Sequence, residues 1–173
     1  MSGRINTLSP RDVVVVINHP LIGAYEVSGF AEDSNINIER GAETWTKYVG
    51  IDNDTTRVYH ADESGMITVS LAQSSGSNDV LYALYNYDRK TRNGQGLFAV
   101  TVKDSSGRSI THANSAWIAV VPNQQSGAEV NTRDWVINCA AMLNQLGGNG
   151  LLSADEVTAI EALGGNVASE WIA

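Results

Sequence analysis

Residues 98–112 read Phe98-Ala-Val-Thr-Val-Lys-Asp-Ser-Ser-Gly-Arg108-Ser-Ile-Thr-His112. Phe98, Val100 and Val102 alternate with smaller or polar residues, which is the period-two pattern of a strand with one buried face. The following segment, 104–108, supplies the Asp, Ser and Gly residues that form tight hairpin loops. The stretch therefore predicts two antiparallel strands joined by a short loop.

Strand patterns of the same kind occupy most of the first 140 residues. Residues 57–61 and 66–72 flank the segment Asp62–Gly65, and we expect Gly65 to adopt a positive φ in a hairpin loop between them. Residues 140–146 fit a strand or a helix equally well. The other predicted strands cover residues 12–18, 24–29, 34–39, 43–49, 116–121 and 133–139, with Trp117 and Trp135 as large apolar anchors.

One helix interrupts the strands. Apolar residues follow a helical spacing from Val80 to Tyr87, and Ser77 is positioned to cap the first turn. The basic residues of segment 89–92 lie where they favour the dipole at the helix end, and Gly94 follows. This basic cluster is therefore interpreted as a helix C-terminus rather than a phosphate site.

A second, short helix is predicted after the glycine-rich segment 147–150. Ser153 and Glu156 have the spacing of a capping box, and two glycines at 164–165 end the element. We divide the chain into a β domain over residues 1–148 and a C-terminal extension over 149–173. One short helix has no core of its own, so we expect its apolar stripe to dock on the outer wall of the domain or on a neighbouring subunit. The stripe consists of Val157, Ile160 and Leu163.

Composition excludes several classes of protein. The chain has 173 residues, 43% of them hydrophobic, a single cysteine and a net charge of −8. No disulfide framework, signal sequence or membrane anchor is expected. An acidic surface repels phosphates, which argues against a DNA-reading role. Half of the net charge lies after residue 144, where no lysine or arginine occurs.

Motifs that carry chemistry are also missing. The sequence contains neither a nucleophile elbow nor a phosphate-binding glycine loop. Asp52-Asn-Asp54 resembles the start of a calcium loop but lacks the turn glycine and the distal glutamate. The three histidines have no metal-ligand spacing, and Cys139 fits a buried small hydrophobe. The sequence therefore predicts no catalytic, metal-binding or cofactor-binding residues, and no enzyme.

Four segments in order resemble the tail tube proteins of contractile-tailed phages. They are Ser28-Gly-Phe-Ala-Glu-Asp-Ser-Asn-Ile-Asn-Ile-Glu-Arg40, Ser77-Asn-Asp-Val-Leu81, Val102-Lys-Asp-Ser-Ser-Gly-Arg108, and the stretch from Ala116-Trp-Ile118 through Glu129-Val130 and Arg133 to Trp135-Val136 and Cys139. The similarity runs from about Asp12 to Gly148, and the segment from Leu151 onward departs from the family pattern.

The resemblance implies a mainly β (α+β) fold of two packed antiparallel sheets or a small β-barrel, flanked by one α-helix. It also implies six subunits in a ring, with inner sheets that join into one barrel. Such rings stack into a tube inside the contractile sheath, and double-stranded DNA passes through at ejection without specific binding. Implied partners are the tail sheath, tape measure, baseplate and tail terminator proteins. The implied location is the virion tail, assembled in the host bacterial cytoplasm.

Two sets of residues are assigned roles on this basis. A conduit should not bind its cargo, so we expect a small-polar, acidic lumen, and the alternating polar residues of two strands fit it. We expect contacts between rings from the two long polar loops, 50–56 and 122–129. The candidate lumen residues are Asn35, Asn37, Glu39, Thr68 and Ser70; the candidate loop residues are Ile51, Asp52, Asn53, Asp54, Asn123, Gln124 and Gln125.

Two other functions remain open from sequence. One is a tube protein of a contractile bacteriocin or secretion machine, which has the same fold and a different cargo. The other is a monomeric β-sandwich that acts as a binding module on the virion. Rings or tubes of the purified protein under the electron microscope would favour a tube, whereas a monomer at high concentration would favour the module.

Overall fold

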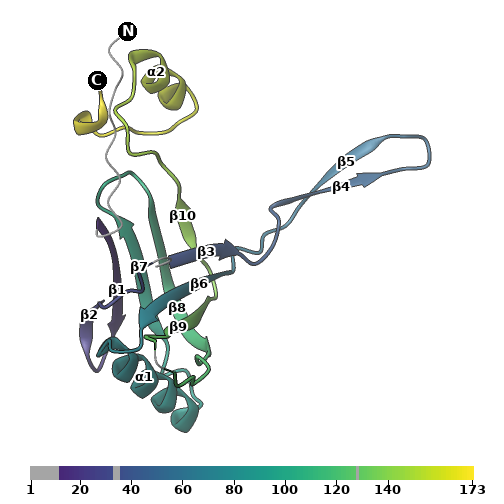
Figure 1. Cartoon of the computed structure of the whole chain (residues 1–173). Coiled ribbons are helices and arrows are strands. Elements are labelled where there is room, and N and C mark those ends of the chain that lie inside the picture. The colour runs from purple at the N-terminus through teal and green to yellow at the C-terminus, as the bar shows by residue number, and fades with distance from the viewer. Residues whose placement is uncertain (1–11, 33–35, 128) are drawn as a thin grey trace.

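The computed structural model describes residues 12–32, 36–127 and 129–173, and the fold is mostly β with two α-helices (Figure 1). In chain order the elements are β1 (Val13–His19), β2 (Gly23–Val27), β3 (Ile36–Arg40), β4 (Trp45–Val49), β5 (Thr55–Tyr59), β6 (Gly65–Ala72), α1 (Ser77–Thr91), β7 (Phe98–Asp104), β8 (Ile110–Val120), β9 (Thr132–Cys139), β10 (Leu143–Gln145), α2 (Ala154–Ala162) and the 3-10 helix η2 (Ser169–Trp171).

Eight strands form one antiparallel sheet in the order β2-β1-β7-β8-β9-β6-β3, with β10 paired to β8. The predicted hairpin at 98–112 is confirmed, because Lys103 pairs with Ile110 and Asp104 N–H donates to Ser109 O. Irregular register near Phe98 and near Ile118 accompanies a strong bend, and β3 and β6 cross the direction of β1 and β7 in Figure 1.

The sheet stays open, because its outermost strands β2 and β3 do not pair with each other. The predicted mainly β fold with antiparallel sheets is confirmed, but the closed small barrel is wrong. The second sheet is the hairpin β4–β5, which projects away from the body instead of packing on it (Figure 1).

The chain crosses from one edge of the main sheet to the other between β2 and β3. Phe30 forms a bridge with Leu71, and Ala31 N–H donates to Ser70 O at 2.9 Å. Gly29 makes this crossing with a φ of +76°, and an added Cβ there would lie 2.6 Å from the Ser75 side chain. Glycine is therefore required twice, by the backbone conformation and by the close approach.

A single core fills the space inside the bent sheet and under α1. Trp135 is 2% exposed and confirms its predicted anchor role, whereas Trp117 is only half-buried. The core therefore joins both halves of the sheet to the helix. Its main buried members are Val15, Ile17, Ile67, Val69, Leu71, Leu81, Leu84, Phe98, Val100, Val102, Ile118, Trp135, Ile137 and Met142.

Helix α1 agrees with the sequence except at its first residue. Ser77 is the first helical residue rather than the cap, and no side chain caps this end. Its hydroxyl instead accepts a hydrogen bond from Ser28 N–H at 3.0 Å and contacts the Tyr25 hydroxyl at 2.9 Å. Arg89 and Lys90 occupy the last turn as predicted, and Gly94 follows with a φ of +82°.

The predicted hairpin between residues 57–61 and 66–72 is wrong. Strand β5 pairs with β4 around the loop 50–54, whereas β6 pairs with β3 and β9. Gly65 has no positive φ; it is buried in β6, and an added Cβ would collide with Met142 and with Glu39 O. Residues 140–146, which fit a strand or a helix equally well in the sequence, contain the short strand β10 and no helix.

Candidate assembly interfaces

One face of the strands β3, β6 and β9 is polar and faces solvent. Asn37 pairs in register with Thr68, and both side chains point away from the buried Ile67 and Val69. Glu39 lies on the same face of β3, and Ser70 lies on that of β6. Asn35 falls outside the described residues. Asn37 and Glu39 are exposed, and Thr68 and Ser70 are half-buried.

Hydrogen bonds along this polar face show that β9 belongs to it. Ser70 Oγ donates to Asp134 Oδ1 at 2.6 Å, and Asn37 Nδ2 donates to Glu39 Oε1 at 2.6 Å. The sequence reasoning missed Asp134 and Asn138, although they alternate with the apolar Trp135 and Ile137. The face thus presents two carboxylates among small polar groups, together with the half-buried apolar side chains of Met66 and Val136.

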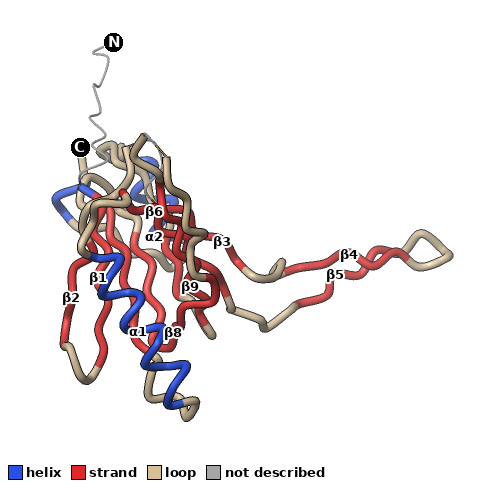
Figure 2. The backbone as a smooth tube through the Cα atoms, turned by 60° about the horizontal axis from the view of Figure 1, so that its bottom comes forward, coloured by secondary structure: helices blue, strands red, loops and turns tan. Residues whose placement is uncertain are grey.

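A second feature is the arm, which we define as residues 41–64. It contains β4 and β5 and extends far from the body, as Figure 2 shows. No residue of β4 or β5 is buried, so the many apolar side chains of the arm are exposed to solvent. The exposed large apolar residues of the arm are Trp45, Tyr48, Val49, Ile51, Val58 and Tyr59.

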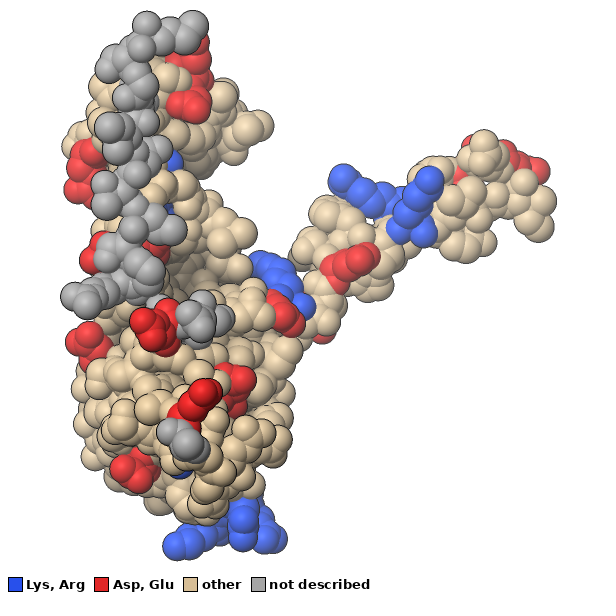
Figure 3. All heavy atoms as spheres, in the orientation of Figure 1, with Lys and Arg blue, Asp and Glu red and all other residues tan. Residues whose placement is uncertain are grey.

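Charge alternates along the arm, because Glu43, Asp62 and Glu63 lie near its base and the bases Lys47 and Arg57 lie in its middle. Lys47 pairs with Arg57 across the hairpin, and the Arg57 guanidinium stacks on the Trp45 ring at 3.8 Å. These bases give the blue patch on the arm in Figure 3. The tip carries the carboxylates Asp52 and Asp54 instead.

The tip is a compact turn. Gly50 N–H donates to Asp54 O at 2.9 Å, and Asn53 N–H donates to Gly50 O at 3.0 Å. Asn53 has a φ of 64°, a conformation that asparagine tolerates better than most residues. This turn holds Ile51 fully exposed, and the predicted loop residues Asp52, Asn53 and Asp54 are exposed beside it.

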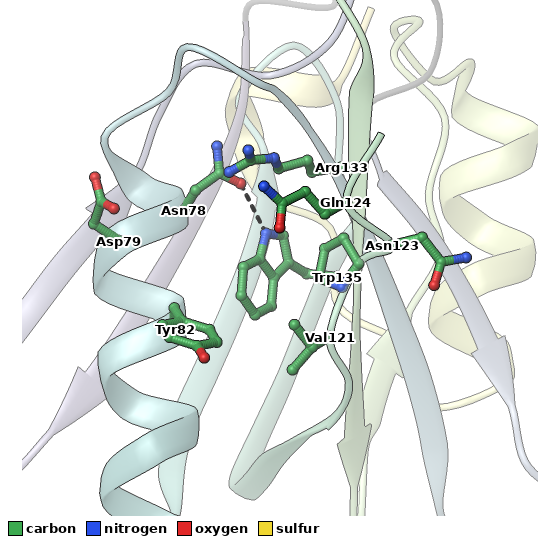
Figure 4. A pocket seen from close by; sticks show the side chains of 9 residues that line it. Asn78, Asp79, Tyr82, Val121, Asn123, Gln124, Arg133 and Trp135 are labelled. Atoms are coloured by element: carbon green, nitrogen blue, oxygen red, sulfur yellow. Dashed lines mark hydrogen bonds between the residues drawn. The ribbon is translucent and has the colours of Figure 1, made fainter. Parts of the chain in front are cut away.

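The other predicted loop lies after β8 and borders a cleft of about 400 Å³ beside α1 (Figure 4). Asn123, Gln124 and Gln125 of this loop are exposed. The predicted loop residues therefore lie at two separate places in one chain, the arm tip and the cleft. The cleft is lined by Asn78, Asp79, Tyr82, Val121, Pro122, Asn123, Gln124, Arg133 and Trp135.

A buried hydrogen bond fixes the floor of the cleft. Trp135 Nε1 donates to Asn78 Oδ1 at 2.9 Å. Asn78 Nδ2 donates in turn to Ala72 O and Ser75 O, both at 2.9 Å, so the start of α1 is tied to the end of β6. Arg133 is half-buried at the rim, and within the described residues no hydrogen bond or ion pair involves its guanidinium.

The C-terminal extension has well-formed helix ends but no buried residue in α2. Ser153 and Glu156 form the predicted capping box. Gly164 N–H donates to Glu161 O and Gly165 N–H donates to Ile160 O, which is a Schellman ending. In the stripe, Val157 and Ile160 are half-buried and Leu163 is 89% exposed, so the stripe leaves apolar surface open.

Arg108 ties the extension to the β7–β8 hairpin. Its Nη1 donates to Gly150 O at 2.6 Å, and its guanidinium lies 4.9 Å from the centre of the Trp171 ring. Leu152 pairs in parallel with Ile172, which closes residues 150–173 into a loop. No local pattern predicts this contact, because Arg108 and Trp171 lie in distant segments of the sequence.

The part of the chain that the structure describes holds no cluster of three or more His, Cys, Asp or Glu side chains suited to a metal ion. It also has no helix both long and apolar enough to cross a bilayer. Burial raises the pKa of the Cys139 thiol to about 11, so the thiol is protonated at neutral pH.

Sequence comparisons identify relatives over most of the chain. Residues 5–147 match the profile of the family described as Bacteriophage PhiTE tail tube protein. Structural protein ORF10 of Pseudomonas phage KPP10 is 42% identical over 173 residues, which cover 99% of this chain and 100% of that protein. The family profile ends where the extension begins, whereas the KPP10 relative spans it.

Two solved structures share the fold. The anti-feeding prophage tube-terminating cap has a TM-score of 0.55 and 10% identity, over 83% of this chain and 93% of that one. The sheath/tube terminator of the extracellular contractile injection system PVC has a TM-score of 0.55 and 11% identity, over 83% of this chain and 100% of that one. At these identities the likeness concerns the fold alone.

Proposed function

The chain belongs to the bacteriophage PhiTE tail tube protein family, and from this premise we propose that it forms hexameric rings that stack into a hollow tube for the ejection of double-stranded DNA. The resemblance seen in the sequence is thereby confirmed. The family and the KPP10 relative are structural proteins of the phage particle, so the chain is a virion component and not an enzyme.

The open sheet is the observation that supports assembly into a ring. Strands β2 and β3 form its two edges, and neither pairs with a further strand in the described chain. Unpaired edges attract other strands unless they are covered. When one edge meets the other edge of an identical subunit, the contact is head-to-tail, and such contacts close into a ring if the rotation allows it.

The polar face of β3, β6 and β9 supports its assignment to the lumen. It carries Glu39 and Asp134, and no lysine or arginine projects from the described β6 and β9 positions on this face. Carboxylates and small polar groups keep phosphates off the wall, because like charges repel. Asn37, Thr68 and Ser70 complete the proposed lining, and Asn35 stays a prediction.

Electron microscopy of the purified chain tests the ring and the tube. We expect rings with six-fold symmetry, or tubes at higher concentration, and a monodisperse monomer would refute both. The lumen assignment has its own test, because the double variant Thr68→Lys/Ser70→Lys should leave rings intact while the tubes retain double-stranded DNA. The comparison variant Lys103→Glu, which changes the charge on β7 instead, should give tubes that do not retain double-stranded DNA.

Ring stacking is proposed to use the arm tip and the loop after β8. Replacement of residues 50–54 by a short glycine turn should leave a folded subunit that forms rings without tubes. Normal tubes would count against the assignment. The extension, residues 149–173, is proposed as a separate appendage whose stripe docks on the outer wall or on a neighbour. Truncation at Gly150 should then weaken assembly or stability.

Tail sheath, tape measure, baseplate and terminator proteins are the proposed partners of the assembled tube, and assembly is proposed to occur in the host cytoplasm. A tube for a bacteriocin or secretion machine stays the second candidate, because one of the solved structures with this fold is the sheath/tube terminator of a contractile injection system. Capture of DNA-filled particles that contain the chain would separate the two functions.

A further inference from the structure

We propose that the arm tip of one subunit inserts into the cleft beside Trp135 of a second copy, with Ile51 against the apolar wall and Asp52 or Asp54 paired with Arg133. The inference rests on the proposed stacking of rings. It assigns the two predicted loops, which lie apart in one chain, to the two sides of one contact between copies.

The cleft has the chemistry of a receptor for such a tip. Tyr82 and Val121 offer apolar surface at its mouth, and Trp135 forms the floor. The Arg133 guanidinium reaches into the same space in Figure 4, and it has no carboxylate partner among the described residues. A carboxylate that enters the cleft can pair with this half-buried cation, and solvent screens such a pair less than one on the open surface.

The charge on the opposite wall does not block an acidic tip. Asp79 also lines the cleft, but its carboxylate points away from Arg133 and Trp135 in Figure 4. The cleft also lies at the first turn of the 15-residue helix α1, and a helix N-terminus favours an anion nearby. Arg133 and the helix end therefore act together on an arriving carboxylate.

The tip has the matching chemistry. Ile51 is fully exposed and projects from a turn held by two backbone hydrogen bonds. Asp52 and Asp54 flank it, and neither carboxylate makes a hydrogen bond or ion pair among the described residues. An apolar side chain with adjacent free carboxylates complements a cleft with an apolar floor and a free guanidinium.

The occupant must come from another copy. The arm extends away from the body, and α1, which lines the cleft through Asn78, Asp79 and Tyr82, lies far from the arm tip (Figures 1 and 2). A tip that enters a cleft on a different surface makes a head-to-tail contact, which propagates along an axis instead of closing a pair. This is the geometry that stacking of rings requires.

Cysteine cross-linking in assembled tubes tests the contact directly. Subunits with Ile51→Cys and Asn123→Cys should give disulfide-linked chains under mild oxidation. Cys139 is buried and its raised thiol pKa keeps it unreactive, so the background should be low. Ile51→Cys with Leu146→Cys is the matched control, because Leu146 is 83% exposed and belongs to none of the proposed contacts.

Charge reversal gives an independent readout. Arg133→Glu should lower tube formation by roughly tenfold, and the second substitution Asp52→Lys or Asp54→Lys should restore it. Restoration also shows that Arg133→Glu folds. Ile51→Asp should block stacking as well, and its full exposure means that it cannot disturb the subunit core.

The outcomes separate the two proposals. If the unaltered chain forms neither rings nor tubes, the proposed function fails and this inference fails with it. If tubes form but the 51–123 cross-link is absent, or the 51–146 control cross-link forms in its place, only the contact between tip and cleft is overturned. Cross-linking at 51–123 together with rescue by charge exchange would establish it.

Discussion

Replacement of Trp135 by phenylalanine should destabilise the subunit by about 2–4 kcal/mol. The change removes the buried hydrogen bond from Trp135 Nε1 to Asn78 Oδ1. The lost bond accounts for about 1 kcal/mol, and the stranded buried oxygen adds about 1–3 kcal/mol. In urea, where a domain of this size has a slope of about 2 kcal/mol/M, the midpoint should fall by roughly 1–2 M.

The measurement is urea denaturation followed by far-ultraviolet circular dichroism, at concentrations below assembly. Trp117→Phe is the matched control, since Trp117 is half-buried and its indole N–H has no hydrogen-bond partner among the described residues. That variant should lose less than about 1.5 kcal/mol. A double-mutant cycle with Asn78→Ala isolates the pair, and strictly additive losses, or equal losses in both tryptophan variants, would refute the reasoning.

Three further experiments probe other parts of the fold. Gly29→Ala should cost about 2–3 kcal/mol in urea denaturation because a Cβ would meet Ser75, whereas Gly23→Ala, with a similar φ and open space, should cost only about 1 kcal/mol. Cys139 keeps its proton to a pH of about 11 when folded but ionises near 9 when unfolded, so its contribution to stability should be constant below pH 9 and fall by about 3 kcal/mol between pH 9 and pH 11. Cys139→Ala should lack this part of the alkaline decline. Arg108→Ala should speed hydrogen exchange in residues 150–173 and leave exchange in the core strands unchanged. Equal exchange of residues 150–173 in Arg108→Ala and in the unaltered chain would contradict the anchoring role.

Local signals in the sequence predicted the elements whose ends depend on nearby residues. The loop at 104–108 and the capping box at Ser153 and Glu156 were both confirmed, because each is closed by hydrogen bonds across a few residues. Alternation in β6 also placed Thr68 and Ser70 on the face opposite the core.

Pairing between strands was predicted less well, because two turns competed for the same strand. The predicted strand 57–61 has a turn on each side, at Gly50 before it and at Gly65 after it. Either turn could pair this strand with a neighbour, the strand 43–49 or the strand 66–72. The core decides between them: Ile67 and Val69 need burial, which β3 and β9 provide, whereas the exposed strand β5 provides none. Such a choice depends on contacts distant in the sequence, so no local pattern could settle it.

The hairpin at 98–112 has two roles, and they explain how an extension can be added to a family fold. Its strands form the centre of the sheet, inside the family-matched residues. Arg108 at its loop binds Gly150 O and stacks on Trp171, both beyond those residues. Because the anchor belongs to the loop between two central strands, the extension is attached without altering a strand. Its exposed stripe and four carboxylates are then held at one place on the subunit surface.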